Sequence, residues 1–288
     1  MGDFTKKILQ TVISEWEEKE LRRLWREAFE EEEAYLDYYH RHFLRMNRIW
    51  TLWDGDALVS MLHVNPYRIW QGDRILPGAF IVGVATDNRY RRQGCMRILM
   101  EDALETLKAE GLMFAHLLPV KEEYYLPFGF TTVGEQHGWI RKRDGEHLEP
   151  FEDPAMFGRT ERWLPMAAPA EMQMVELADF YNQWLKAHYS SFVWRDGAYF
   201  KRRWNEARAF SDQIYQLQES GRINGAATLE AGKDYWRLYD VAGDDLIARL
   251  EQSPDWTPDE KSLKIMIKWF KKPELVADWL PFAVEELT

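Results

Sequence analysis

The chain has 288 residues, 46% of them hydrophobic and 15% aromatic, and a formal net charge of −11. This length exceeds the needs of one small domain, so two domains are expected. An acidic chain is repelled by nucleic acid and by anionic membranes, and we expect neither as a partner.

No apolar run approaches the roughly 20 residues that span a bilayer, and the N-terminal residues lack the apolar stretch of a signal peptide, so we expect a cytoplasmic protein. The single cysteine, Cys95, excludes a disulfide framework and a thiolate metal cluster, and no metal site is expected.

Two helices are predicted between Ser14 and about Leu44. The acidic run Glu30 to Glu33 predicts the break between them, most simply as a solvated turn. Apolar residues recur at helical spacing in two groups, Leu21, Leu24, Trp25, Ala28 and Phe29, then Tyr35, Leu36, Tyr39 and Phe43.

Two hairpins are predicted next. Residues 49–53 and 57–64 flank the turn Asp54-Gly55-Asp56, and residues 67–70 and the run from Ile75 flank a turn at 71–74. Apolar runs on either side of a short glycine-containing turn are typical of antiparallel strands.

The stretch from Ala79 to Met96 carries the strongest signal. Residues 79–85 form an unbroken apolar run, which is typical of a strand buried on both faces. Arginines and a glycine follow in the loop at 86–96, where the N-terminus of the next helix leaves backbone N–H groups unpaired, and that combination binds a pyrophosphate. The loop lacks the Gly-Lys-Ser/Thr ending of a Walker loop and the three glycines of a dinucleotide fingerprint. The helix is predicted from the apolar residues Met96, Leu99, Met100, Ala103, Leu104 and Leu107.

A second buried strand is predicted from Leu112 to Leu118, and a last one from about Gly134 to Arg141. Between them, the segment Tyr125-Leu126-Pro127-Phe128-Gly129-Phe130 places a tyrosine beside a Phe-Gly-Phe turn.

The polar stretch from Arg141 to about Gly158 is the predicted interdomain linker. Beyond it, predicted helices at 171–187 and about 196–209 precede strands at 214–219, 223–230 and 235–241, which repeats the element order of the first half. The segment after that third strand, Asp240 to Asp245, is acidic and would repel phosphate. From Thr257 a capping-box start favours a helix, whereas the alternation of Leu263, Ile265, Ile267 and Trp269 favours a strand, and the sequence leaves both open.

Two motifs resemble those of a known family. Arg91-x-x-Gly94-x-Met96, after Val84-x-Thr86, resembles motif A of the GCN5-related N-acetyltransferases (the GNAT superfamily), although Met96 stands where the family has a small residue. The tyrosine segment at 125–130 resembles the Tyr-x-x-Phe-Gly-Phe/Tyr element of motif B, at the family's distance. The resemblance implies an α/β (α+β) fold with a central mixed, twisted sheet flanked by helices. Only residues 79–131 carry these specific motifs.

The layout is similar to the enhanced-intracellular-survival (Eis-type) branch: a catalytic GNAT domain at 1–150, then a degenerate GNAT-like domain at 160–288 that has no cofactor loop. Too few residues remain for the full sterol-carrier-like third domain common in the family. The implied activity is acetyl-CoA-dependent transfer of an acetyl group to a primary amine of a small molecule or a lysine-type acceptor. Acetyl-CoA is the implied cosubstrate, and a homo-oligomer is left open. The net charge of −11 suits an amine acceptor, although solubility alone explains it more simply, and the run at 30–33 would border the acceptor site.

The resemblance also implies the site residues. Backbone amides of the loop would hold the pyrophosphate, and the strand end before it would pair with the pantetheine arm and polarise the acetyl carbonyl. Tyr125 is the expected general acid, with a packed aromatic as the alternative, whereas Tyr124 would point the opposite way and be structural. The expected cofactor-binding residues are Val84, Ala85, Thr86, Arg91, Arg92, Gln93, Gly94, Cys95 and Met96.

The general base is left open. The Eis-type branch implicates the C-terminal carboxylate, here Thr288, but places it on the third domain. Glu122 and Glu123 beside the tyrosine, or a water chain to bulk solvent, are alternatives. His116, on a buried strand, is expected to be a satisfied core histidine. Cys95 is most simply a small residue that starts the helix, with an alkylation-sensitive thiol as the alternative.

Two other functions compete with an acetyltransferase. A non-catalytic, regulatory acyl-CoA-binding module would keep the fold without turnover, and the intact Arg91, Gly94 and Tyr125 argue against it. A tandem-domain aminoacyl transferase of the peptidoglycan-bridge type reads an RNA-borne donor, which the acidic charge and the preserved loop disfavour.

Overall fold

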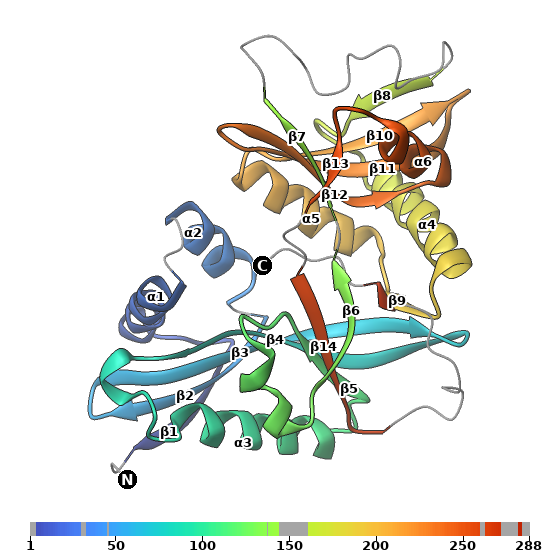
Figure 1. Ribbon diagram of the computed structural model, residues 1–288. Helices are drawn as coiled ribbons and strands as arrows, with labels where there is room; N and C mark the ends of the chain where they lie inside the picture. The colour runs from blue at the N-terminus through green and yellow to red at the C-terminus, as the bar shows by residue number, and fades with distance from the viewer. Residues whose placement is uncertain are drawn as a thin grey trace. The chain divides into compact units, whose positions relative to one another are not determined.

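The computed structural model describes residues 4–29, 33–44, 46–136, 138–143, 161–259, 263–271 and 282–283 (Figure 1). The chain divides into two compact units. The first unit runs to Val133 and resumes at Lys264, and the second runs from Gly134 to Leu263 and takes in residues 282–283. This division differs from the expected one at 1–150 and 160–288, because a C-terminal segment returns to the first unit. The linker expected up to Gly158 lies largely outside the described residues.

The first unit is a mixed sheet with helices on both faces, and the fold class expected from the sequence is confirmed. Strands follow one another in the order β1-β2-β3-β4-β5-β14-β6. Helix α3 lies along one face, and α1 and α2 lie on the other (Figure 1). Its strands are β1 (Thr5–Gln10), β2 (Arg48–Asp54), β3 (Ala57–Gln71), β4 (Arg74–Thr86), β5 (Phe114–Leu117), β6 (Thr131–Gln136) and β14 (Leu263–Trp269), and its helices are α1 (Glu15–Phe29), α2 (Glu33–His42) and α3 (Cys95–Ala109).

The predicted helices and hairpins of the first half are confirmed, with two differences. Strand β1, which the sequence analysis missed, pairs antiparallel with β2. The two predicted strands at 57–64 and 67–70 form one strand, β3, that continues through Pro66. Proline has no N–H to donate to a neighbouring strand. The pairing of β3 with β2 ends at Val64, so Pro66 leaves no bond of that ladder broken.

A bulge and a fork shape the end of β4. The register with β3 shifts between Met61 and His63, which inserts one extra residue into β4. Gly83 lies at this bulge with a φ of 61°. On its other edge β4 pairs with β5 only from Gly78 to Phe80, so the two strands part beyond Phe80. The backbone of residues 81–86 therefore has no partner on the β5 side among the described residues.

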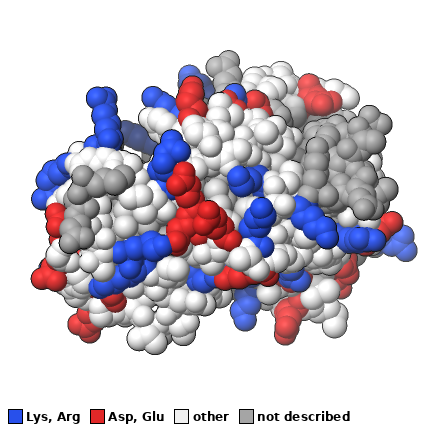
Figure 2. All heavy atoms as spheres, turned by 90° about the horizontal axis from the view of Figure 1, so that it is seen from below, with Lys and Arg blue, Asp and Glu red and all other residues white. Residues whose placement is uncertain are grey.

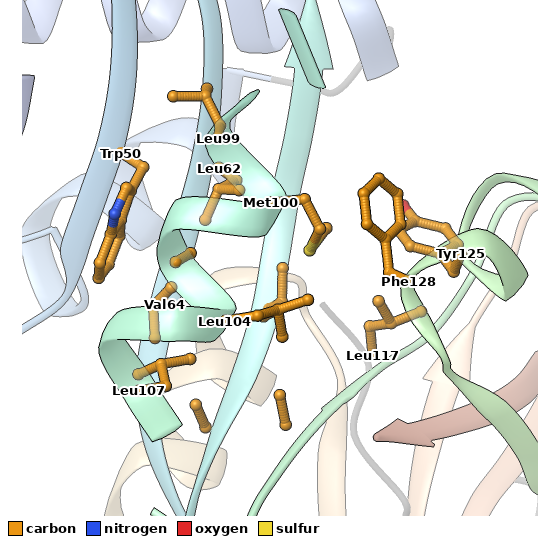
Figure 3. Packing of buried hydrophobic residues seen from close by; sticks show 14 of the residues in the cluster. Trp50, Leu62, Val64, Leu99, Met100, Leu104, Leu107, Leu117, Tyr125 and Phe128 are labelled. Carbon is orange, nitrogen blue, oxygen red and sulfur yellow. The ribbon is translucent and has the colours of Figure 1, made fainter. Parts of the chain in front are cut away.

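The core of the first unit lies between α3 and the sheet. Figure 3 shows Leu99, Met100, Leu104 and Leu107 of α3 pointing toward the strands, with the tyrosine turn on the other side of Met100. These residues are the apolar face that the helical spacing predicted, and Cys95 joins them at the first turn. The face of the sheet carries Trp50, Leu52, Leu62, Val64, Ile81, Ala115 and Leu117 into the same cluster.

The segment from Thr257 forms strands at Thr257–Pro258 and Leu263–Trp269, so the strand alternative is confirmed over the capping-box helix. Strand β14 inserts between β5 and β6 and pairs antiparallel with β5, opposing Ile267 to His116. Met266 lies fully buried in the core beside α3. The single last strand expected at 134–141 is instead two strands, β6 and β7 (Trp139–Lys142), of which β7 joins the sheet of the second unit.

The second unit contains a sheet in the order β13-β7-β12-β11-β10-β8. The predicted order of helix, helix and three strands is confirmed by α4, α5 and β10 to β12. The strands of this sheet are β7, β8 (Glu161–Pro165), β10 (Gln213–Glu219), β11 (Arg222–Ala231), β12 (Tyr235–Ala242) and β13 (Thr257–Pro258). The unit also contains β9 (Ser191–Val193) and β15 (Phe282–Ala283), which pair with each other, and the helices α4 (Glu171–His188), α5 (Gly197–Ala209) and α6 (Asp244–Gln252). No helix in the described part of the chain is long and apolar enough to cross a bilayer.

The third strand of this meander, β12, repeats the bulge of β4. The register of β11 with β12 shifts between Ala226 and Thr228, and Asp240 lies at the shift with a φ of 52°. A positive φ is unfavourable for a residue with a side chain. The buried Asp240 carboxylate pairs with the buried Arg195 guanidinium at 2.8 Å, and Arg195 lies 4.3 Å from the ring centroid of Tyr181. A buried ion pair thus stands where the first unit has a glycine.

We predict that Met266→Ala destabilises the first unit by roughly 2–5 kcal/mol, because it leaves a cavity in the core beneath α3. Urea unfolding measures the loss. The matched control is Met172→Ala, whose side chain is 73% exposed and whose truncation should cost little. Equal effects of the two substitutions would show that β14 does not complete this core.

We predict that Gly83→Ala is much more destabilising than Gly94→Ala. Both glycines have positive φ, so each alanine is strained by roughly 1–2 kcal/mol. A Cβ at Gly83 would also lie 2.5 Å from the Trp25 ring, whereas a Cβ at Gly94 would meet nothing within 4 Å. Overpacking adds roughly 1–3 kcal/mol at Gly83 alone. Thermal unfolding of the two variants should therefore give clearly separate midpoints.

Candidate cofactor-binding site

The loop from Arg91 to Gly94 turns the chain from β4 into α3. Arg92 and Gly94 both adopt positive φ, 63° and 85°, and Gly94 caps the helix. Arg91 before them is extended, with φ −62° and ψ 153°, so the chain turns sharply within this loop. Backbone N–H groups that a turn directs to one side make a concave anion site. The first intrahelical bond at this end is donated by the Ile98 N–H to the Gly94 carbonyl at 3.1 Å, so the N–H groups of residues 95–97 have no backbone acceptor.

Asp87 holds the start of the loop in place. It is 4% exposed, and its Oδ1 accepts from the Arg89 backbone N–H at 3.0 Å, which caps the short 3-10 helix Asn88–Tyr90. Its Oδ2 accepts from the Arg89 guanidinium at 2.8 Å and from Arg23 of α1 at 3.3 Å. The hydrogen bonds from Arg89 lower the pKa of Asp87 to about 2, so the carboxylate stays charged. Arg23 also donates to the Leu58 carbonyl at 2.9 Å, which ties α1 to β3.

The other side chains of the loop are disposed as an anion site requires. Arg91, Arg92, Gln93 and Gly94 are exposed, and the Arg91 Nε donates to the Thr86 carbonyl at 3.3 Å. Cys95 is buried, its Sγ lies 3.8 Å from the Tyr90 carbonyl, and burial raises the pKa of its thiol. A raised pKa leaves little reactive thiolate, which favours the simpler of the two expectations, a small residue that starts the helix.

The strand end before the loop offers free backbone. Ala85 and Thr86 pair with β3 on one edge, with Ser60 Oγ donating to the Ala85 carbonyl at 2.8 Å, and Val84 lies in the bulge. Their other edge lies beyond the fork with β5. An extended ligand that carries amides can add to such an edge as a further strand.

Tyr125 lies in the turn after β5, on the α3 side of the sheet (Figure 3). Its side chain is 7% exposed, its ring makes an edge-on contact with Phe130 at 6.1 Å, and burial raises its pKa to about 12. Its hydroxyl makes no hydrogen bond to the described residues. Tyr124 is 52% exposed, so the two tyrosines do point different ways, but Tyr124 is a surface residue rather than a packed one.

The tyrosine turn is anchored by β14, a contact that the sequence analysis missed. The Lys264 Nζ lies 2.6 Å from the Glu122 carboxylate, which also accepts from the Thr132 hydroxyl, and the Lys268 Nζ donates to the Phe128 carbonyl. The bonds from Lys264 and Thr132 lower the pKa of Glu122, which makes it a poor base. About 140 residues separate Lys264 from Glu122 and Lys268 from Phe128, so no local pattern could have revealed these two contacts.

His116 is buried as expected, but only one of its ring nitrogens is satisfied. Nδ1 lies 3.1 Å from the Ala79 carbonyl, whereas Nε2 has no partner among the described residues. The described residues contain no cluster of three or more potential metal ligands. On the face seen in Figure 2, both basic and acidic side chains are present.

Comparisons with known proteins agree with this geometry. Residues 12–133 match the family model described as an acetyltransferase (GNAT) domain. No curated protein matches the chain. A solved protein of unknown function from Enterococcus faecalis, titled a probable N-acyltransferase, is 17% identical with a TM-score of 0.68, over 93% of this chain and 73% of its own.

A GCN5-related N-acetyltransferase from Anabaena variabilis is 14% identical with a TM-score of 0.68, over 93% of this chain and 73% of its own. Eis1 from Mycobacterium abscessus is 15% identical with a TM-score of 0.57, over 88% of this chain and 65% of its own. Such identities establish a shared fold. Residues 12–133 thus resemble a GNAT acetyltransferase domain in sequence, and the solved structures resemble the chain in fold.

Proposed function

We propose that this protein is an acetyl-CoA-dependent N-acetyltransferase that acetylates a primary amine of a small molecule or of a lysine-type acceptor. The observation that carries the proposal is the junction of β4 and α3. A concave loop of free N–H groups at Arg91 to Met96 directly follows a strand end whose second edge is open. That arrangement suits a ligand with a pyrophosphate at one end and an amide-bearing arm at the other.

The donor would lie with its pyrophosphate on the loop and its pantetheine arm along residues 84–86. The exposed guanidinium groups of Arg91 and Arg92 add positive charge next to the helix N-terminus. A backbone N–H near the bulge would polarise the thioester carbonyl, which elsewhere contributes roughly 2.7–4 kcal/mol per donor. The ion pair between Arg23 of α1 and Asp87 at the start of the loop would fix the position of the loop relative to α1.

In the transfer step the amine nitrogen bonds to the acyl carbon, and the carbon–sulfur bond breaks with its electron pair on sulfur. Tyr125 would donate its proton to that sulfur and recover one, through solvent, from the amine nitrogen. A thiol has an ordinary pKa of about 8.5, well below the value of about 12 for Tyr125, so full transfer to a free thiolate is uphill. Donation therefore accompanies cleavage of the carbon–sulfur bond, while the sulfur still carries only part of its charge.

We further propose that the second unit is a GNAT-like domain without a cofactor site of its own. The β12 bulge is followed at once by Gly243 and α6, whose first turn carries Asp244 and Asp245. Asp244 is held by Trp184 Nε1 at 2.8 Å and His188 Nε2 at 3.0 Å. Carboxylates at this helix N-terminus take the place of an anionic ligand.

We predict that Gly94→Glu abolishes acetyl-CoA binding, because it places a carboxylate in the pyrophosphate loop. Gly55→Glu is the matched control, since Gly55 also has positive φ and open space around its Cα but lies in the β2–β3 turn. Calorimetry should give one site per chain for the parent and the control, and no measurable site for Gly94→Glu. Equal affinities in all three proteins would refute the loop assignment, and two sites would refute the proposal for the second unit.

We predict that Tyr125→Phe lowers kcat roughly 10²-fold or more while donor affinity persists, because it removes one oxygen and little volume. Tyr124→Phe, the control, should match the parent. Thiol release is measured with a panel of spermidine, lysine amide and n-butylamine. Since the pKa of Tyr125 is about 12, an alkaline limb below about pH 10 belongs to another group and should persist in Tyr125→Phe. Near-parental turnover in Tyr125→Phe would exclude the phenol as the proton donor.

A further inference from the structure

His116 lies at the fork of the central sheet. It is the last β5 residue paired with β4, directly opposite Phe80, and its ring is fully buried. Neighbouring residues of β5 alternate in direction, and Ala115 and Leu117 face α3. The His116 ring therefore faces the side of the sheet away from α3.

The tautomer of His116 follows from its one hydrogen bond. The Ala79 carbonyl, 3.1 Å from Nδ1, can only accept, so Nδ1 carries the proton and Nε2 presents a lone pair. Burial lowers the pKa of His116 to about 3, so the ring remains neutral at any ordinary pH. His116 Nε2 is thus a permanent hydrogen-bond acceptor.

Two further polar atoms near His116 are also unpartnered. The Tyr67 hydroxyl is buried without a hydrogen bond to any described residue, and the Tyr67 ring centroid lies 4.6 Å from that of His116. Asn65 is separated from His116 by Phe80 on β4 and its side chain hydrogen-bonds Tyr39, although its Oδ1 has no partner among the described residues. Buried polar atoms almost always find partners, and an unmet one costs about 1–3 kcal/mol. Such atoms on two residues whose rings lie 4.6 Å apart, His116 and Tyr67, point to a bound polar group.

The chemistry of these atoms selects the kind of group. His116 Nε2 and Asn65 Oδ1 can only accept, and the Tyr67 hydroxyl can accept as well. Aromatic rings surround the position, since Phe80 lies 4.8 Å and Phe114 5.8 Å from the His116 ring centroid. A group with N–H donors can bond to these acceptors and can also pack against the aromatic faces. A carboxylate or phosphate has no proton to donate, and its negative charge is repelled by an aromatic face.

We propose that Tyr67 and His116 form the subsite that holds the attacking amine of the acceptor, with its N–H groups donating to the Tyr67 hydroxyl and to His116 Nε2. The assignment rests on the proposed acetyltransferase function. It makes both residues determinants of acceptor binding rather than of donor binding. His116 is the β5 residue next to the point beyond which β4 has no β5 partner among the described residues.

The test compares Tyr67→Phe and His116→Phe with the parent, using the best amine of the panel in the thiol-release assay. Each phenylalanine keeps a ring and removes the proposed acceptor, and His116→Phe also removes the Nδ1–H that donates to the Ala79 carbonyl. The expected result is a rise of roughly 10-fold in the amine KM in each variant, with the acetyl-CoA Kd unchanged. Tyr215→Phe, which loses a 3.2 Å bond to Gln213 in the second unit, is the control and should leave the amine KM unchanged.

The amine KM, and not the thermal midpoint, separates a subsite from a merely structural pair. Parental amine KM in a folded Tyr67→Phe, whatever its thermal midpoint, would overturn the proposal and leave a buried structural water as the occupant. If His116→Phe does not fold, Tyr67→Phe decides alone.

A second readout is independent of turnover. In protein labelled with ¹⁵N-histidine and saturated with coenzyme A, His116 should show the Nδ1–H tautomer, and its Nε2 signal should move on titration with n-butylamine. An unmoved signal would overturn the subsite. A moving signal without turnover of any amine would instead refute the proposed acetyltransferase function and leave the amine subsite standing.

Discussion

The packing of Trp25 against Gly83 is the constraint on which the site depends. The bulge at Gly83 turns the end of β4 away from its register, and β5 leaves the strand at Phe80. A side chain at position 83 would collide with the Trp25 ring, so the close approach of α1 to the sheet requires glycine there. The same α1 carries Arg23, which reaches Asp87 at the start of the loop. One helix thus positions both the open strand edge and the anion loop.

The opposite wall of the site depends on a strand from the far end of the chain. Strand β14 places Met266 in the core beneath α3 and directs Lys264 and Lys268 to the tyrosine turn. The turn therefore has its position set by charge-assisted bonds as well as by the packing of Phe128 and Phe130. This explains why Glu122, next to the proposed proton donor, has an anchoring role and little basicity.

The two units share a β-bulge with a positive φ, but different side chains surround it. Each has a bulge with a positive φ in the third strand of its meander, at Gly83 and at Asp240. In the first unit the glycine admits Trp25, and a long loop follows. In the second unit the Asp240 carboxylate is neutralised by Arg195, and a helix with acidic first residues follows at once.

The sequence by itself determined the elements whose signals are local. The buried run before the loop, the helical spacing after it and the turn chemistry at 125–130 gave β4, α3 and the tyrosine turn, because periodicity and N-terminal helix chemistry act over a few residues. Only the tertiary structure decided the rest. It showed that β14 belongs to the first sheet, that Lys264 reaches Glu122, and that His116 has a free nitrogen beside Tyr67. Such contacts join residues 49 to 142 positions apart, and their energies depend on burial and on a partner that no local pattern specifies.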